Sequence, residues 1–208
     1  MKPRSNPNRT LDDPPGTVRW GMARPREFDR ATALDKAMDL FWERGGYDRT
    51  SVSDLTAAMG ISSPSLYGTF GGKRELFDEA VAQYAQRPNA PVVQAISAPT
   101  AYEVVAQMLE KAVVEYTDPS HPLGCLINSD PLLGDRRDEG RALIAHRLGR
   151  AADDGDLPAD VAPDDLAEFL VVVLNGLAAR ARDGVPRERL LAVTEVARRT
   201  LADSRHVE

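Results

Sequence analysis

Residues 50–73, TSVSDLTAAMGISSPSLYGTFGGK, predict two short helices joined by a tight turn. Ser51 can cap the first helix, and Asp54 follows it at the spacing of a capping box. Three apolar residues give this helix one hydrophobic face: Leu55, Ala58 and Met59. Gly60 comes next, and glycine readily adopts the left-handed backbone that ends a helix in a tight turn.

The second helix of this stretch has an unusually small and polar surface. Ser62 can cap it, and Pro64 falls in its first turn, where a missing N–H is tolerated. The surface is then formed by Ser63, Ser65, Tyr67, Gly68 and Thr69. Such a surface suggests that another backbone comes close. Two short helices of this kind place the second one in the DNA major groove, so the stretch predicts a DNA-binding helix-turn-helix.

The expected DNA contacts are of three kinds. Phosphates should be held by Thr50, Ser62, Ser63, Tyr67 and Lys73, and we include Ser51 in this set. Bases should be approached by Ser63, Pro64, Ser65, Tyr67 and Gly68. Arg24 and Arg26 flank Pro25 on a flexible arm and are expected to enter the minor groove.

The segment from Ala23 to Ala85 resembles the DNA-binding domain of TetR-family transcriptional regulators. RPREFDRATALDKAMDLFWERGG is similar to the family's arm and first helix, and SLYGTFGGKRELF to its recognition helix and the helix that follows. The most specific part is the Leu-Tyr-x-x-Phe-x-x-Lys run from Leu66 to Lys73. HPLGCLINSD and ARDGVPRERLLAV extend a weaker resemblance to one large branch of the family, so most of the chain is covered.

Two positions depart from the family pattern. ERGGYDRTS contains one glycine more than usual, which should lengthen the first loop, and Thr56 stands where alanine is common. The resemblance implies an all-α fold: an N-terminal three-helix helix-turn-helix domain followed by a helical ligand-binding and dimerisation domain. It also implies a homodimeric repressor that releases a palindromic double-stranded operator when a small molecule acts on the C-terminal domain.

The chain divides into three segments. Residues 1–21 are rich in proline and asparagine and nearly free of apolar side chains, so we expect a disordered N-terminal extension. Residues 22–86 should form the helix-turn-helix domain, and residues 87–208 the effector-binding and dimerisation domain. Outside the motif, helices are expected near residues 29–44, 72–85, 100–117, 123–133, 136–152, 165–182 and 186–202.

The net charge of −6 is unusual for a DNA-binding protein, but it is unevenly distributed. Residues 1–21 carry four basic and two acidic side chains, and residues 22–86 carry eight and ten. The acids of the second segment lie mostly on its expected first and fourth helices, which can face away from DNA. Because the charge at the contact surface governs phosphate binding, the composition is compatible with DNA binding of modest nonspecific affinity.

The expected effector surface lies on the helix from Thr100 to Thr117 and the segment after it. Its candidate ligand-binding residues are Tyr102, Met108, Leu109, Tyr116 and Cys125. A cavity lined in this way would be mainly apolar with a few polar tips, which suits a hydrophobic or aromatic ligand. The effector itself is unidentified, and no other cofactor is expected.

Cys125 has two interpretations. It follows a Pro/Gly break and should lie in the first turn of a helix, where the helix dipole lowers a thiol pKa. Some electrophile-responsive repressors of the branch that this chain resembles have a reactive cysteine in a similar Gly-Cys-Leu context. The alternative is that this single cysteine is a small buried hydrophobe.

Residues 165–182, DLAEFLVVVLNGLAARAR, are apolar on nearly every side, so this helix must be buried on more than one face. It could form the deep core of one chain. The interpretation we favour is a two-fold interface in which this helix and the last one pair with their copies, as in the family. The expected interface residues are Leu170, Val173, Leu174, Leu177, Leu190 and Val193, with Asn175 and Gly176 at a close helix crossing.

Other classes of function lack support in the sequence. Gly71-Gly72-Lys73-Arg74 lacks the first glycine and the hydroxyl residue of a phosphate-binding loop, and the histidines and the cysteine show no zinc spacing. We therefore expect no catalytic site, no metal, no membrane span and a cytoplasmic location. Two alternatives stay open: a helical enzyme or small-molecule carrier, and a protein-interaction module that uses the motif as a docking helix.

Overall fold

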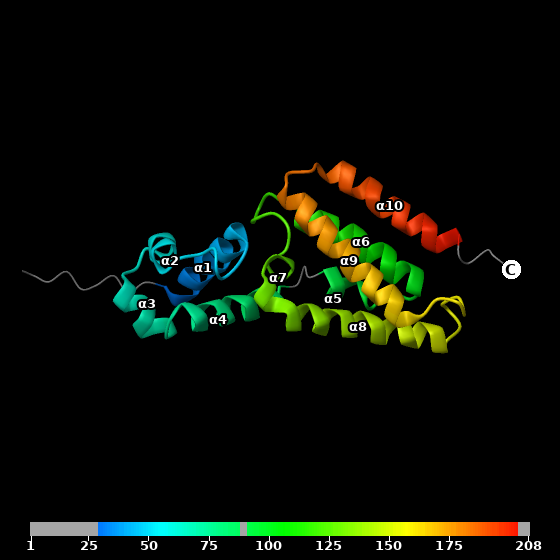
Figure 1. The fold of residues 1–208 in the computed structure, drawn as a ribbon, viewed down its shortest axis with the longest axis horizontal. Helices are drawn as coiled ribbons and strands as arrows, with labels where there is room; N and C mark the ends of the chain where they lie inside the picture. Colours follow the sequence, from blue (N-terminus) through cyan, green and yellow to red (C-terminus); the bar gives the residue numbers. More distant parts are fainter. Residues whose placement is uncertain (1–28, 88–90, 204–208) are drawn as a thin grey trace, which may run out of the picture.

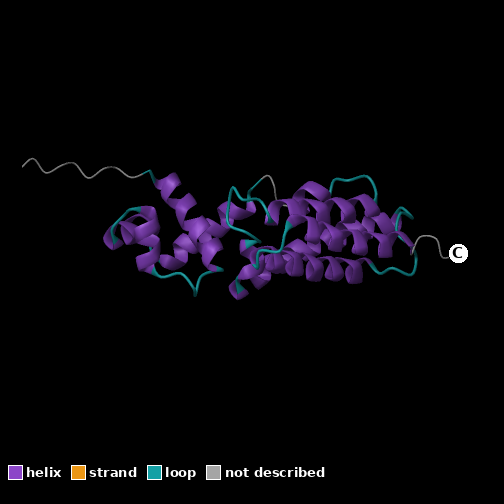
Figure 2. Ribbon diagram, turned by 90° about the horizontal axis from the view of Figure 1, so that it is seen from above, coloured by secondary structure: helices purple, strands orange, loops and turns teal. Residues whose placement is uncertain are grey.

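The computed structural model describes residues 29–87 and 91–203, and this part of the chain is helical, without strands (Figure 2). Two lobes lie end to end (Figure 1). The N-terminal lobe contains α1 (Arg30–Arg44), α2 (Val52–Met59), α3 (Ser63–Phe70) and α4 (Lys73–Ala85). The C-terminal lobe contains α5 (Pro91–Ala95), α6 (Ala101–Tyr116), α7 (Leu126–Ser129), the 3-10 helix η1 (Pro131–Leu133), α8 (Gly134–Asp153), α9 (Pro163–Arg182) and α10 (Arg187–Asp203). The predicted fold class is confirmed.

Local hydrogen bonds set the limits of the motif helices. The Ser51 hydroxyl accepts from the Asp54 N–H at 3.1 Å, and the Asp54 carboxylate accepts from the Ser51 N–H at 3.0 Å, which completes the predicted capping box. Gly60 then adopts a left-handed backbone, with φ of 71°, and its N–H donates to the Thr56 carbonyl. The Ser62 hydroxyl accepts from the Ser65 N–H at 3.3 Å and begins α3.

The N-terminal lobe has a core of aromatic and aliphatic side chains that fixes α2 and α3 against α1 and α4. Phe41 of α1 and Phe77 of α4 are both fully buried and meet edge to face, with ring centroids 4.9 Å apart. Leu55 of α2 and Leu66 of α3 are also fully buried. Ala58, expected on the buried face of α2, is exposed. The predicted helical periodicity of α2 is confirmed, but its buried face is narrower than expected and includes only Leu55 and Met59.

The C-terminal lobe differs from expectation in two places. The helix expected near residues 123–133 is divided into α7 and η1, because Asp130 has an extended backbone and precedes Pro131, a position where helical geometry is disfavoured. The proline-rich stretch between Pro88 and Pro99, expected only as a boundary, contains the short helix α5. Within the described residues, no helix combines the length and apolar character that crossing a membrane would require.

Candidate nucleic-acid interface and effector cavity

One face of α3 is open to solvent. Ser62, Ser63, Pro64 and Gly68 are exposed, and the Tyr67 side chain is 54% exposed. On its opposite face, α3 is anchored by the buried side chains of Leu66 and Phe70. The structure therefore brings most of the predicted base-approaching residues onto one free surface, while Ser65 is partly covered by its contact with Ser62.

Gly68 has no structural requirement for the absence of a side chain. Its φ is not positive, and among the described residues a Cβ added there would meet no neighbouring atom within 4 Å. A glycine inside a helix is less stable than alanine by roughly 0.5–1 kcal/mol. Since the protein's own packing does not explain this glycine, an external molecule that approaches α3 closely is the remaining structural explanation.

The structure removes Thr50 from this surface. Thr50 is buried, and its hydroxyl donates to the Gly46 carbonyl at 2.9 Å, so the side chain stabilises the loop between α1 and α2. Ser51 is exposed, but its hydroxyl donates to Asp54 at 2.6 Å within the capping box. Both side chains therefore have local structural roles: Thr50 stabilises the loop, and Ser51 caps α2. Arg24 and Arg26 lie outside the described residues.

Lys73 lies at the start of α4, next to the exposed face of α3. Its ammonium nitrogen lies 3.9 Å from the centroid of the Tyr47 ring, and the Arg74 guanidinium lies 5.8 Å from the same centroid. A cation that stacks on an aromatic ring is held in place while its outer side remains available to an anion. Tyr47 therefore acts as a support for Lys73, a role that the sequence did not indicate.

A cavity of about 230 Å³ opens in the C-terminal lobe, with walls from α4 through α9. Its lining is mainly apolar and includes Val92, Ile127, Leu143, Ile144, Val171 and Leu174. A few polar side chains also line it, among them Arg87, Glu115, Asn128 and Arg137. This composition is typical of small-molecule sites, which combine apolar walls with a small number of placed polar groups.

Only part of the expected ligand surface lines this cavity. Tyr116 and Cys125 do, whereas Tyr102, Met108 and Leu109 do not. Met108 and Leu109 are buried in the hydrophobic core, and the Tyr102 hydroxyl accepts from Arg198 of α10 at 2.8 Å. The periodicity of α6 shows that one face is buried, but it cannot distinguish core packing from a cavity wall.

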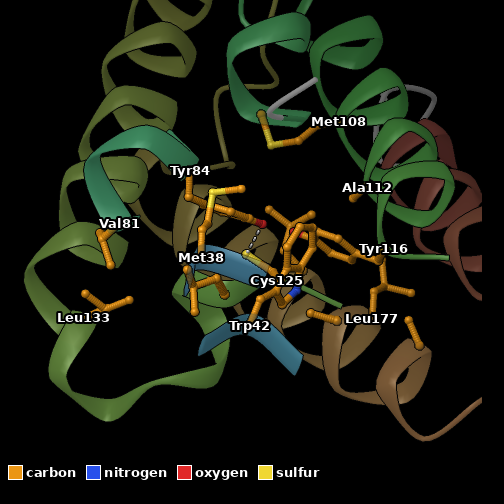
Figure 3. Packing of buried hydrophobic residues seen from close by; sticks show 14 of the residues in the cluster. Met38, Trp42, Val81, Tyr84, Met108, Ala112, Tyr116, Cys125, Leu133 and Leu177 are labelled. Atoms are coloured by element: carbon orange, nitrogen blue, oxygen red, sulfur yellow. Dashed lines mark hydrogen bonds between the residues drawn. The ribbon is translucent and has the colours of Figure 1, made fainter. Parts of the chain in front are cut away.

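Cys125 lies in the floor of the cavity beside two tyrosines. Figure 3 shows the Tyr84 hydroxyl directed at the Cys125 sulfur, and the O–H donates to Sγ at 3.3 Å. Burial raises the pKa of the Cys125 thiol, and the hydrogen bond from Tyr84 opposes this only in part. The expected lowering of the thiol pKa is therefore wrong, because desolvation by burial is the largest effect on it, and Cys125 is the N-cap residue of the four-residue α7 and does not lie in its first turn.

We expect iodoacetamide to alkylate Cys125 in the native protein at least about tenfold more slowly than in the same chain unfolded in guanidinium chloride at about pH 7.5. The thiolate is the nucleophile, and the raised pKa means that it forms at higher pH than in an ordinary cysteine. Mass spectrometry of the intact protein gives the rates, and Cys125→Ser, which has no thiol, is the blank. Equal rates in the two states would show that the native thiol is accessible and as reactive as an ordinary cysteine, which would contradict the raised pKa.

The two lobes meet in a buried seam that contains ionisable groups. The Trp42 indole of α1 stacks on the His121 ring, with centroids 4.5 Å apart, and Arg87 lies 4.8 Å from the Trp42 ring. Glu115 of α6 forms an ion pair with Arg87 at 3.1 Å, and its carboxylate lies 3.3 Å from Nε2 of His121. Because Arg87 and Glu115 also line the cavity, the seam joins the cavity wall to the N-terminal lobe.

The outer faces of α9 and α10 carry exposed apolar side chains. On α9, Phe169, Val172, Gly176 and Ala179 are exposed at helical spacing along one stripe. On α10, Val193 and Val196 are 47% and 65% exposed. Four of the expected interface residues instead face the interior of the same chain: Leu170, Leu174, Leu177 and Leu190. Val173 is partly buried, and Val193 is exposed as expected.

Comparison with known proteins identifies the family. The family model described as bacterial regulatory proteins, tetR family, matches residues 33–80. The HTH-type transcriptional repressor ComR of Escherichia coli (strain K12) is 31% identical over 190 residues, which cover 85% of this chain and 90% of ComR. The chain belongs to the TetR family of bacterial transcriptional regulators. The HTH-type transcriptional repressor BdcR of the same strain is 30% identical over 186 residues, covering 84% of this regulator and 89% of BdcR.

A solved structure is similar to this TetR-family regulator over most of its length. It is a cysteine mutant of the TetR family regulator CifR, complexed with 26-bp double-strand operator DNA. It has a TM-score of 0.77 and 44% sequence identity, and it covers 85% of this chain and 98% of the CifR chain. The helices α2 and α3 are thus the helix-turn-helix of a transcriptional regulator.

Proposed function

We propose that this regulator is a homodimeric repressor that binds a palindromic operator through α3 and releases it when a small molecule occupies the cavity. The free face of α3 carries the proposal. On this face Tyr67 is exposed, and the packing within the chain does not require Gly68 to lack a side chain. The chain is also 44% identical to a regulator whose structure was solved in complex with operator DNA. The domain division that fits this function is residues 22–86 for DNA and residues 87–208 for effector binding and dimerisation.

The DNA contacts that we propose are the exposed residues of the motif. Ser62, Ser63 and Lys73 would hold phosphates, and Tyr67 would do so through its hydroxyl. Pro64 and Gly68 would allow α3 to approach the bases closely. Arg24 and Arg26 remain proposed minor-groove contacts of the arm.

The same surface gives a first test of individual contacts. Tyr67→Phe is expected to weaken operator affinity about 25-fold, because each chain of the dimer loses about 1 kcal/mol for one hydrogen bond to a phosphate. Fluorescence anisotropy with labelled operator measures it. Tyr102→Phe, which removes a phenolic hydroxyl group from the C-terminal lobe, is the matched control and should bind the operator as the wild type does. If Tyr67→Phe also binds as wild type with an unchanged melting temperature, the phosphate role is wrong.

Dimerisation is supported by the exposed stripe on α9. Phe169 and Val172 expose large apolar surfaces, and Gly176 offers a site where a second helix can approach closely, since a Cβ there would meet no atom within 4 Å. The Oδ1 atom of the neighbouring Asn175 is buried and has no hydrogen-bond partner among the described residues. A second copy of the chain would cover the apolar stripe.

The effector that suits the cavity is a small, mainly apolar molecule with one polar group. The volume of about 230 Å³ limits its size, and the charged side chains of Arg87 and Arg137 in the lining suit a polar group that accepts hydrogen bonds. To reverse a 99:1 population of the DNA-binding state, the ligand must bind the other state more tightly by about 5.5 kcal/mol. An electrophile that acts on Cys125 is less well supported, since that thiol has a raised pKa.

The two other classes of function have less support. The described residues contain no group of three or more His, Cys, Asp or Glu side chains placed to hold a metal, and in the cavity Arg87 pairs with Glu115 while Arg137 donates to backbone carbonyls. We therefore propose that the regulator is not an enzyme and acts in the cytoplasm, where it can reach the chromosome. If α3 served instead to dock another protein, the purified regulator would not bind DNA.

The experiment that tests the function is selection of DNA. Purified protein is mixed with sheared genomic DNA of its own host, and the bound fragments are sequenced. We expect a short palindrome with half-sites about one helical turn apart, roughly 34 Å, to be enriched. Recovery of no enriched sequence by a folded dimer would contradict the proposal and favour a docking role.

A further inference from the structure

The loop between α1 and α2, residues 45–51, is held by the C-terminal lobe. Gly46 has a positive φ of 122°, and a Cβ added to it would overlap the Asp130 carboxylate. Asp130 lies between α7 and η1 and is only 2% exposed. The close approach therefore requires glycine at position 46, within the Gly-Gly pair that departs from the family pattern in the sequence.

Asp130 joins the two lobes through its two carboxylate oxygens. Oδ2 accepts from the Tyr47 N–H at 2.5 Å, and Oδ1 accepts from the Leu132 N–H at 2.8 Å. A carboxylate that accepts backbone N–H groups forms hydrogen bonds roughly twice as strong as neutral ones. One oxygen thus caps η1 within the C-terminal lobe, while the other holds the backbone of a loop in the DNA-binding lobe.

Tyr47 passes this restraint to the DNA surface. Its ring supports the Lys73 ammonium at 3.9 Å and packs edge-on against Phe77, with centroids 5.3 Å apart. If Tyr47 moves with its backbone, the support beneath Lys73 moves as well. A single loop residue, Tyr47, thus connects Asp130 to Lys73, one of the expected phosphate contacts.

The same segment touches the cavity. Arg137, which lines the cavity, donates through Nη1 to the carbonyls of Ile127 at 2.7 Å and Asp130 at 2.8 Å. Figure 1 shows α7 between the two lobes, and α7 contacts both α1 and α4. A molecule in the cavity that binds the Arg137 guanidinium would compete with these carbonyls and loosen the Asp130 segment.

We propose that Asp130 is a positioning residue for DNA binding: it holds Tyr47, and thereby Lys73, in the conformation that binds operator phosphate, and Arg137 links it to the cavity. This proposal rests on the proposed function, because it assigns Lys73 a phosphate. It adds a defined connection between the lobes, which runs from Arg137 through Asp130 and Tyr47 to Lys73.

The first test needs no DNA. Asn at position 130 keeps one acceptor oxygen but replaces the other with an amide donor, so it cannot serve both N–H groups. In Asp130→Asn, we expect the Tyr47 amide to exchange with deuterium at least about tenfold faster than in the wild type. Asp156→Asn is the matched control: Asp156 accepts from the Ala101 N–H at 2.5 Å within the C-terminal lobe, a single hydrogen bond that the Asn oxygen can keep, so the Tyr47 exchange rate should not change.

The second test uses the selected operator. Each phosphate contact that is lost should flatten the slope of log K against log salt by about 0.9, so a substitution carried by both chains of the dimer should flatten it by about 1.8. We expect this change in Asp130→Asn and in Lys73→Gln, and no further change in the double variant. In Tyr47→Leu, which keeps the backbone N–H but removes the ring, we expect the same flatter slope with the exchange rate of residue 47 unchanged.

The outcomes separate the two proposals. If the Tyr47 amide exchanges at the wild-type rate in folded Asp130→Asn, the connection between the lobes is refuted. If the amide exchanges faster but the slope of log K against log salt is that of the wild type, Asp130 has only a structural role. Should Asp130→Asn not fold, Gly46→Ala, which places a methyl group against the same carboxylate, is measured in the same way. If the wild type binds no operator, the proposed function fails while the exchange result still stands.

Discussion

Replacing Trp42 with alanine is expected to lower the free energy of unfolding by about 3–5 kcal/mol, because a fully buried indole leaves a large cavity. Trp42 also contacts both lobes: it stacks on His121, and its ring meets Tyr84 edge-on with centroids 4.9 Å apart. We therefore expect the DNA-binding lobe to unfold before the C-terminal lobe in the variant. Urea titration followed by circular dichroism measures both effects.

Trp42→Phe is the matched control. The Trp42 Nε1 atom is buried without a hydrogen-bond partner among the described residues, so phenylalanine loses volume but no hydrogen bond. It should retain the stack on His121 and cost clearly less than alanine. A Trp42→Ala protein within about 1 kcal/mol of the wild type would show that the seam between the lobes contributes little to stability.

Val172→Glu is expected to convert the dimer into monomers at micromolar concentration. The Val172 side chain is 60% exposed on one chain, but it lies in the proposed interface, where two-fold symmetry would bury two unpaired carboxylates. Light scattering coupled to gel filtration gives the mass. Operator affinity should fall by orders of magnitude, since a monomer contacts only one half-site of a palindrome.

Val114→Glu gives the control for this experiment. Val114 is 44% exposed on α6, outside the stripe on α9, so the same change should leave the mass and the melting temperature unaltered. A monomeric wild type at micromolar concentration, or a dimeric Val172→Glu, would place the interface elsewhere. Leu177→Glu is unsuitable, because Leu177 is buried within the single chain and the variant would unfold.

The helix-turn-helix was predictable from the sequence because its signals are local. The capping box of Ser51 and Asp54 and the left-handed Gly60 are decided by hydrogen bonds and backbone preferences within a few residues, and the structure has them where predicted. The open face of α3 was predictable for the same reason, since small polar side chains opposite Leu66 and Phe70 have nothing to bury. The family resemblance rests on these same residues.

The faces of α9 could not be predicted, because a helix that is apolar all round offers no contrast between inner and outer sides. Leu170, Leu174 and Leu177 pack inside the chain, and the exposed stripe runs through Phe169 and Val172. The interpretation as monomer core therefore holds for one face of the helix, and the two-fold interface stays a prediction for the other. Its inner face is monomer core, and its outer face is available for a partner.

The sequence by itself determined the helical fold, the limits of the motif and the class of protein, because these depend on spacing along the chain. Only the tertiary structure decided that Thr50 is internal, that the Cys125 thiol has a raised pKa, and that Asp130 holds Tyr47. Each of these depends on desolvation or on a contact between residues far apart in the chain. Asp130 and Tyr47 are separated by 83 positions, and neither residue has a local feature that indicates the other.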